Sequence, residues 1–217
     1  MIGHIPPLFY DCNHGWALRF KAVFERYQHV IRFGMYGHEH DEWIQLYPSV
    51  RNPNVFMGMA FMVGSSTTYL YKNPGFSVID LDQQFMVPIN IHTHFFNISK
   101  AHDHPQNANF EYLHDFLSFY NLTSLSPDSI YNQLAVNVRD NETAAMRYKW
   151  NLVKQSSAKV PKGCNWNCRR LLFCEITASE QFDFNVCLGN PQYDFINLPS
   201  QGLMNLFSEV WMVDVVQ

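Results

Sequence analysis

Three histidines stand where the chain is expected to turn after a strand. His4 lies between a glycine and a Pro-Pro pair, and His38 and His40 follow Gly37. Glycine permits a sharp turn and proline restricts the loop that follows it. A His-x-His loop can present its imidazoles to the two ions of a paired-metal site, which lie about 3.5 to 4 Å apart. His4, His38 and His40 are therefore the candidate metal ligands, although His-x-His spacing alone also arises by chance.

Most of the other histidines are interpreted as non-ligands. One pair shares a single face of an expected strand and another lies in a polar linker, and neither brings further ligands with it. Two more lie on expected helices and are interpreted as surface or core-edge side chains. These six residues are His92, His94, His102, His104, His29 and His114.

The periodicity of apolar residues predicts the elements that hold the candidate ligands. A helix is expected over residues 15–30 and strands over residues 1–4, 31–36, 42–47, 55–63, 76–81 and 85–93. The candidate ligands then fall on loops at strand ends, where functional residues concentrate. From about residue 109 the period becomes helical, with helices expected over residues 110–120, 127–138, 143–154 and 165–178.

This division gives three regions. Residues 1–108 form an α/β region, residues 109–190 a helical subdomain, and the pattern of residues 191–217 predicts no definite structure. Hydrophobic residues make up 47% of the 217 residues and charged residues 16%, which is typical of a packed globular protein. The net charge of -4 and the lack of Lys/Arg-rich runs exclude nucleic acid as an expected partner.

The N-terminal residues do not have the pattern of a signal peptide. Met1 is followed by no basic region, apolar stretch or small-residue cleavage site. No apolar run reaches the roughly 18 residues that a transmembrane helix needs. The cysteines argue for an oxidising compartment instead, and this conflict leads us to expect that the natural N-terminus lies upstream.

Five cysteines divide into Cys12 alone and a C-terminal group of four, Cys164, Cys168, Cys174 and Cys187. The group could hold zinc or form disulfides, but it lacks the two-residue gaps of zinc ribbons, so disulfides are favoured. Four cysteines allow three connectivities. Sequons at Asn97, Asn121 and Asn141 suit a secreted glycoprotein, although such triplets also arise by chance.

Longer motifs resemble a known family. Residues 3–7 (Gly-His-Ile-Pro-Pro) and 37–40 (Gly-His-Glu-His) resemble the last two motifs of the calcineurin-like metallophosphoesterases. Residues 66–69 (Ser-Thr-Thr-Tyr) and 73–76 (Asn-Pro-Gly-Phe) resemble the segment that follows in acid sphingomyelinase and its relatives, and Asn97 falls at one of their sequons. The resemblance covers most of the chain and implies the C-terminal half of a β-sandwich flanked by helices, followed by a disulfide-bonded helical subdomain.

The resemblance also implies a site with two zinc ions. His4 and His38 would bind one ion and His40 the other, and Tyr69 would contact the substrate. Family members add an Asp-x-His, a Gly-Asp-x-x-Asp and a Gly-Asn-His-Glu motif from their N-terminal half, and none of these occurs in this sequence. Three imidazoles alone do not hold two dications tightly. We therefore expect this chain alone to be inactive and to need the missing half as its partner.

The resemblance further implies that neighbouring cysteines pair, Cys164 with Cys168 and Cys174 with Cys187. It places the partner of Cys12 in the missing half, and the protein in the secretory pathway, secreted or lysosomal. The implied activity is hydrolysis of a phosphodiester, with sphingomyelin as the phospholipid substrate. Two alternatives are a relative that cleaves nucleotides and a non-catalytic binding or structural protein of the same family.

Overall fold

A computed structural model describes residues 1–7 and 12–189. The predicted tail over residues 191–217 lies outside the described residues. These residues have mixed α/β structure with two three-stranded sheets, and the predicted α/β fold class is confirmed. The first sheet has the order β1-β3-β2 and the second has the order β4-β5-β6.

The first sheet follows an N-terminal helix. Helix α1 (His14–Arg26) precedes β1 (Gly34–Tyr36), β2 (Trp43–Pro48) and β3 (Phe56–Met62). β3 pairs in parallel with β1 and antiparallel with β2. All six residues of β2 are buried, as expected of a strand covered on both faces. The helix begins where Asn13 accepts a hydrogen bond from Gly15 N, which is a common N-cap arrangement.

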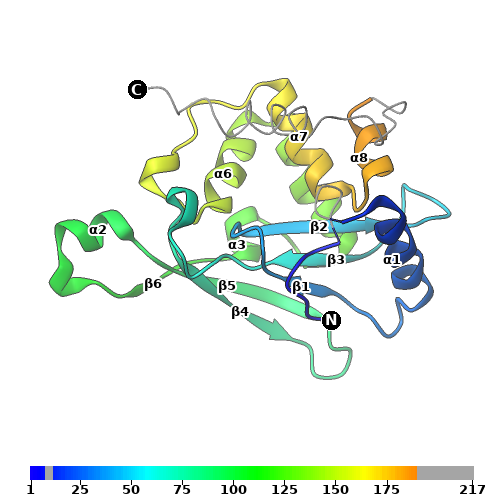
Figure 1. Cartoon of the computed structure of the whole chain (residues 1–217), viewed down its shortest axis with the longest axis horizontal. Helices are drawn as coiled ribbons and strands as arrows, with labels where there is room; N and C mark the ends of the chain where they lie inside the picture. The colour runs from blue at the N-terminus through cyan, green and yellow to red at the C-terminus, as the bar shows by residue number, and fades with distance from the viewer. Residues whose placement is uncertain (8–11, 190–217) are drawn as a thin grey trace.

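The second sheet consists of β4 (Gly75–Leu81), β5 (Pro88–Phe96) and β6 (Phe110–Asp115), all antiparallel. Along β5, buried residues alternate with half-buried ones, so one face of this sheet is covered. Ile91 of β5 belongs to the same core as Ile44 and Phe61 of the first sheet. Helix α2 (Ile98–Asp103) lies in the connection between β5 and β6 (Figure 1).

The prediction of a helix over residues 110–120 is partly wrong. Residues 110–115, expected to be helical, form β6, and only α3 (Phe116–Tyr120) is a helix. Because β6 pairs with β5, the strand that follows the predicted boundary at residue 108 belongs to the second sheet. His114, expected on a helix as a surface or core-edge residue, lies on β6 and is buried. Exposed and half-buried residues alternate only over residues 110–113, and a period of two over so short a stretch is hard to distinguish from a helix by apolar spacing.

The C-terminal region is helical and covers the first sheet. α4 (Pro127–Ser129), a π-helical segment (Ile130–Ala135) and α5 (Val136–Asp140) follow one another directly. α6 (Glu142–Leu152), α7 (Trp166–Thr177) and α8 (Gln181–Cys187) complete the region. Helices α6 and α7 lie on the side of β2 and β3 opposite to β4 and β5 (Figure 1). The disulfides are Cys164–Cys168 and Cys174–Cys187, which confirms both predicted pairs.

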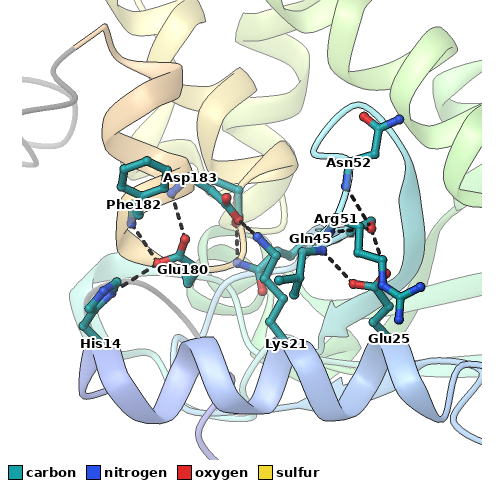
Figure 2. A network of polar contacts seen from close by, with 12 residues as sticks. His14, Lys21, Glu25, Gln45, Arg51, Asn52, Glu180, Phe182 and Asp183 are labelled. Atoms are coloured by element: carbon teal, nitrogen blue, oxygen red, sulfur yellow. Dashed lines mark hydrogen bonds and ion pairs between the residues drawn. The ribbon is translucent and has the colours of Figure 1, made fainter.

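Polar contacts join α1 to the C-terminal helices (Figure 2). Lys21 Nζ lies 2.5 Å from Asp183 Oδ2, and both side chains are largely buried. His14 Nδ1 lies 3.2 Å from Glu180 Oε2. Glu180 also caps α8 by accepting hydrogen bonds from the first backbone N–H groups of that helix. The N-terminal helix is therefore tied to the disulfide-bonded end of the described chain.

Candidate metal site

The N-terminal residues run beside β1 and bring His4 to the histidine loop, residues 37–41. Gly3 N donates to Met35 O at 3.0 Å and Met35 N donates to Met1 O at 2.9 Å, as in a parallel pair. One step further, Gly37 N donates to His4 O at 2.9 Å. The pairing register thus carries His4 to the start of the loop that holds the other two candidate ligands.

His4 and His38 meet at this point. His4 Nε2 and His38 Nδ1 are 3.4 Å apart, and the two rings are nearly perpendicular with centroids 5.2 Å apart. Both residues are exposed. In a tetrahedral site with Zn–N bonds of about 2.05 Å, two nitrogen ligands lie about 3.3 Å from each other. The separation and the donor type of this pair therefore fit one zinc ion.

The histidine loop has an uncommon backbone. His38 has a φ of 71° and His40 a φ of 62°, in the left-handed region that non-glycine residues rarely adopt. Such a residue costs about 1–3 kcal/mol and persists only where its surroundings hold it in place. Positive φ values of this kind are found disproportionately at ligand-binding positions.

His40 contacts a different group of side chains from those that His4 and His38, the other two candidate ligands, contact. Its Nδ1 lies 3.2 Å from Thr67 Oγ1, and its ring lies edge-on to the ring of Tyr69, with centroids 5.8 Å apart. With the proton on Nδ1 donated to Thr67, Nε2 keeps the lone pair that a metal needs. Burial lowers the pKa of His40, with further lowering from the nearby Lys72 ammonium, which favours the neutral imidazole.

Two buried lysines lie beneath the histidine loop. Lys72 Nζ donates to Glu39 O at 2.9 Å and lies 2.9 Å from Asp41 Oδ1. Lys154 Nζ donates to His40 O at 3.4 Å. Burial raises the pKa of the Asp41 carboxyl, and the Lys72 ammonium opposes this shift. Neither lysine could be identified from the sequence, because a lysine far along the chain has no spacing signal that links it to a loop.

The three candidate ligands therefore lie at or beside the histidine loop, in two groups. His4 and His38 converge, whereas His40 stands beside Thr67 and Tyr69. Within residues 1–7 and 12–189, no set of three or more His, Cys, Asp or Glu side chains converges as a metal site would require. The described residues thus supply imidazoles for a site but no carboxylate that completes it, and the assignment of His4, His38 and His40 as ligands stays a prediction.

The structure also places Tyr69, the three sequons and Cys12, the other predicted site residues. The ring of Tyr69, 63% exposed, lies close enough to His40 to face the same ligand. Among the sequons, Asn121 and Asn141 are exposed and Asn97 is half-buried as the N-cap of α2. Cys12 Sγ donates to Pro6 O at 3.4 Å. The substrate contact, the glycans and the disulfide partner of Cys12 in a missing segment all stay predictions.

The fold and the site define the chain as an α/β protein with histidines gathered at strand ends and a disulfide-bonded helical region. No family model matches the chain. Several curated proteins are similar to the chain in sequence. Sphingomyelin phosphodiesterase A of Dictyostelium discoideum is 27% identical over 190 residues, which are 87% of this chain and 32% of the relative. Sphingomyelin phosphodiesterase 2 of Caenorhabditis elegans is 24% identical over 86% of this chain and 31% of the relative.

The sphingomyelin phosphodiesterase of Homo sapiens is 24% identical over 178 residues, which are 80% of this chain and 27% of the relative. The predicted resemblance to the acid sphingomyelinase-like phosphodiesterases is confirmed over most of this chain. The chain spans about a third of the length of the curated relatives named here. No helix among the described residues is long and apolar enough to span a bilayer.

Proposed function

We propose that this chain forms part of a zinc-dependent phosphodiesterase that hydrolyses sphingomyelin to ceramide and phosphocholine. The observation that carries the proposal is the approach of His4 Nε2 to His38 Nδ1 at 3.4 Å, the separation that two nitrogen ligands of one tetrahedral zinc adopt. The curated relatives, which are named for sphingomyelin phosphodiesterase activity, support the substrate class.

Each residue has a separate part in this function. His4 and His38 bind one zinc ion and His40 binds a second, with Thr67 orienting the ring of His40. Bound zinc would neutralise phosphate charge and lower the pKa of a bound water. Tyr69 presents its ring beside His40, where a phenol can both pack against a lipid and donate a hydrogen bond to a phosphate oxygen.

The proposal requires anionic ligands beyond these three imidazoles. A closed zinc site has at least three protein ligands per ion, and the described residues bring no carboxylate to His4 and His38. We propose that a further segment, corresponding to the two thirds of the relatives that this chain does not cover, supplies them. This chain alone would then bind zinc weakly and turn over no substrate.

The proposed setting is the secretory pathway, with a secreted or lysosomal protein. Cys164–Cys168 and Cys174–Cys187 support it, since disulfides persist mainly in oxidising compartments. Glycans on Asn97, Asn121 and Asn141 would belong to the same setting.

The test uses the native protein, isolated from its source with an antibody against this chain. Sphingomyelin vesicles and a chromogenic nucleotide diester are supplied with zinc, with a zinc chelator, and with zinc restored. Phosphocholine release that the chelator abolishes and zinc restores is expected. If the protein cleaves the nucleotide diester and not sphingomyelin, it is the nucleotide-cleaving relative instead.

Matched variants link this activity to the site. His38→Ala in the expressed gene should abolish hydrolysis. His29 is exposed and precedes β1 in the sequence, and His29→Ala should leave hydrolysis unchanged. If the zinc-loaded native protein hydrolyses neither substrate, the non-catalytic alternative replaces the proposed function.

A further inference from the structure

Lys154 is a fully buried lysine whose own backbone is strained. Its exposure is 0%, and it follows α6 with a φ of 49°, next to Gln155 with a φ of 52°. Helices commonly end in a left-handed residue, but glycine is usual there because it carries no side chain. A lysine in this position indicates that the direction of its side chain matters.

The backbone of Lys154 is held from both sides. Lys154 N donates to Asn151 O at 2.8 Å and Gln155 N donates to Trp150 O at 3.0 Å, which closes the end of α6. Asn73 Nδ2 donates to Lys154 O at 3.0 Å. Asn73 itself is buried, and its Oδ1 accepts a hydrogen bond from Ile98 N at 3.3 Å. These contacts aim the lysine side chain away from α6 and toward the first sheet.

Two glycines leave a passage for this side chain. A Cβ atom at Gly64 would overlap Lys154 Nζ, and one at Gly75 would lie 2.5 Å from Lys154 Cδ. Any larger residue at either position would have to displace the lysine. Through this passage the ammonium group reaches the carbonyl oxygen of His40.

Lys72 approaches the neighbouring peptide from a second direction. Its ammonium group donates to Glu39 O at 2.9 Å and pairs with Asp41, and the residue is 6% exposed. The carbonyls of Glu39 and His40 are the two that follow the left-handed residue His38. Two buried ammonium groups therefore contact the part of the backbone whose φ values are unfavourable.

We propose that Lys72 and Lys154 are positioning residues that hold the histidine loop with His38 and His40 at positive φ, and so aim their imidazoles at the metal. This proposal rests on the proposed zinc role of the three histidines. The lysines do not contact zinc or substrate, and they act through the carbonyl oxygens of Glu39 and His40.

The test compares Lys72→Met and Lys154→Met with a matched control, Lys21→Met. Lys21 is also a buried lysine, 5% exposed, but it belongs to α1 and its side chain pairs with Asp183 of α8 (Figure 2). All three variants remove a buried ammonium group, and Lys72→Met and Lys21→Met each also leave the carboxylate of an ion pair behind. Only Lys72→Met and Lys154→Met remove a contact with the histidine loop.

The first readout needs no metal. One-bond Cα–Hα couplings measured by NMR report the sign of φ at His38 and His40 in each variant. Both residues are expected to leave the positive-φ region in Lys72→Met and Lys154→Met and to keep it in Lys21→Met. If His38 and His40 keep positive φ in both loop-lysine variants, the proposal is overturned, whatever the zinc affinity.

The second readout is zinc affinity, followed through the imidazole nitrogen shifts of His38 and His40 during a Zn²⁺ titration. Loss of either loop lysine should weaken binding by about tenfold, the lower end of the range for residues that orient metal ligands. Lys21→Met should bind as the wild type does, and wild-type affinity in both loop-lysine variants would count against the proposal.

Failure of the proposed zinc function can be told apart from failure of the proposed role of the lysines. If the wild-type imidazoles do not respond to zinc, the proposed zinc function fails, and the φ comparison still decides the role of the lysines. If Lys154→Met does not fold, Gly64→Ala replaces it, because the added methyl group would displace the Lys154 ammonium while keeping the lysine. Gly64→Ala should then also shift φ at His40, and an unchanged φ there would contradict the role of Lys154.

Discussion

His4 Nε2 and His38 Nδ1 lie 3.4 Å apart, although 34 positions separate the two residues in the chain. The contact depends on backbone pairing, since Gly37 N donates to His4 O. Removal of either imidazole should therefore weaken zinc binding by at least tenfold, or about 1.4 kcal/mol. A competition titration against a chromophoric chelator measures this for His4→Ala and His38→Ala. The exposed His29 provides the control, and an equal loss in His29→Ala would show that zinc binds elsewhere.

Glu42 is a buried carboxylate that connects the first sheet with the second sheet and with α6. Its oxygens accept hydrogen bonds from Thr93 Oγ1 at 2.6 Å and Asn151 Nδ2 at 2.9 Å, and His114 Nε2 lies 2.9 Å away. Glu42→Leu leaves these polar groups buried without their acceptor and should lower the free energy of unfolding by roughly 3 kcal/mol.

Urea denaturation of Glu42→Leu measures this loss. The control is Glu111→Leu, since Glu111 forms a more exposed pair with Lys100 that should contribute less than about 1 kcal/mol. Equal losses in the two variants would show that the buried network has no special role in stability.

The Cys174–Cys187 disulfide closes the segment that contains α8 and its contacts with α1. Its sequence separation is 13, against 4 for Cys164–Cys168. Loop-closure entropy predicts that its removal lowers the free energy of unfolding by about 3 kcal/mol, and by about 2 kcal/mol for the shorter loop. Paired Cys→Ala variants compared by urea denaturation test this order, and a larger loss from the shorter loop would contradict it.

Glu175 on α7 is 6% exposed, and burial raises its pKa from 4.5 to about 8, with Asp41 adding to the shift and Lys149 opposing it. The folded state therefore favours the protonated carboxyl. Its contribution to stability is fully present below pH 4.5 and is lost as the pH rises toward 8. Over this window the wild type should lose on the order of 4 kcal/mol more unfolding free energy than Glu175→Gln.

Chemical denaturation at intervals between pH 4.5 and 8 measures both stability profiles. Glu175→Gln should be the more stable protein at pH 7, because the wild-type carboxyl, ionised in the unfolded chain, must take up a proton to be buried, whereas the neutral glutamine need not. Parallel profiles for the two proteins would show that Glu175 titrates as it does in the unfolded chain.

Much of the fold could be predicted from local pattern. The alternation and length of apolar runs indicated β2, β3 and β4, and helical spacing indicated α6 and α7. Segment 110–115 was assigned wrongly because Phe110 and Leu113, three residues apart, fit a helix, whereas Phe110 and Tyr112, two apart, fit a strand, and pairing with β5 decides the outcome. Tertiary pairing of this kind leaves little trace in a single segment.

The candidate site was predictable only in part. Glycine and proline around His4 and His38 marked turns, and the motif resemblance joined the two turns into one site. The loop lysines were not predictable, since Lys154 reaches His40 across 114 positions and through a passage opened by Gly64 and Gly75. A strained lysine after a helix, where glycine is usual, becomes visible only once the backbone is known.

Anomalous scattering at the zinc edge, from zinc-soaked crystals of the native protein, shows whether His4 and His38 share one zinc ion. We expect a peak about 2 Å from both His4 Nε2 and His38 Nδ1. Two other histidine positions offer internal comparison, His92 beside Asp80 and His94 stacked on Phe76. Zinc bound only at such positions, or no peak between His4 and His38, would show that these two imidazoles do not hold a zinc ion.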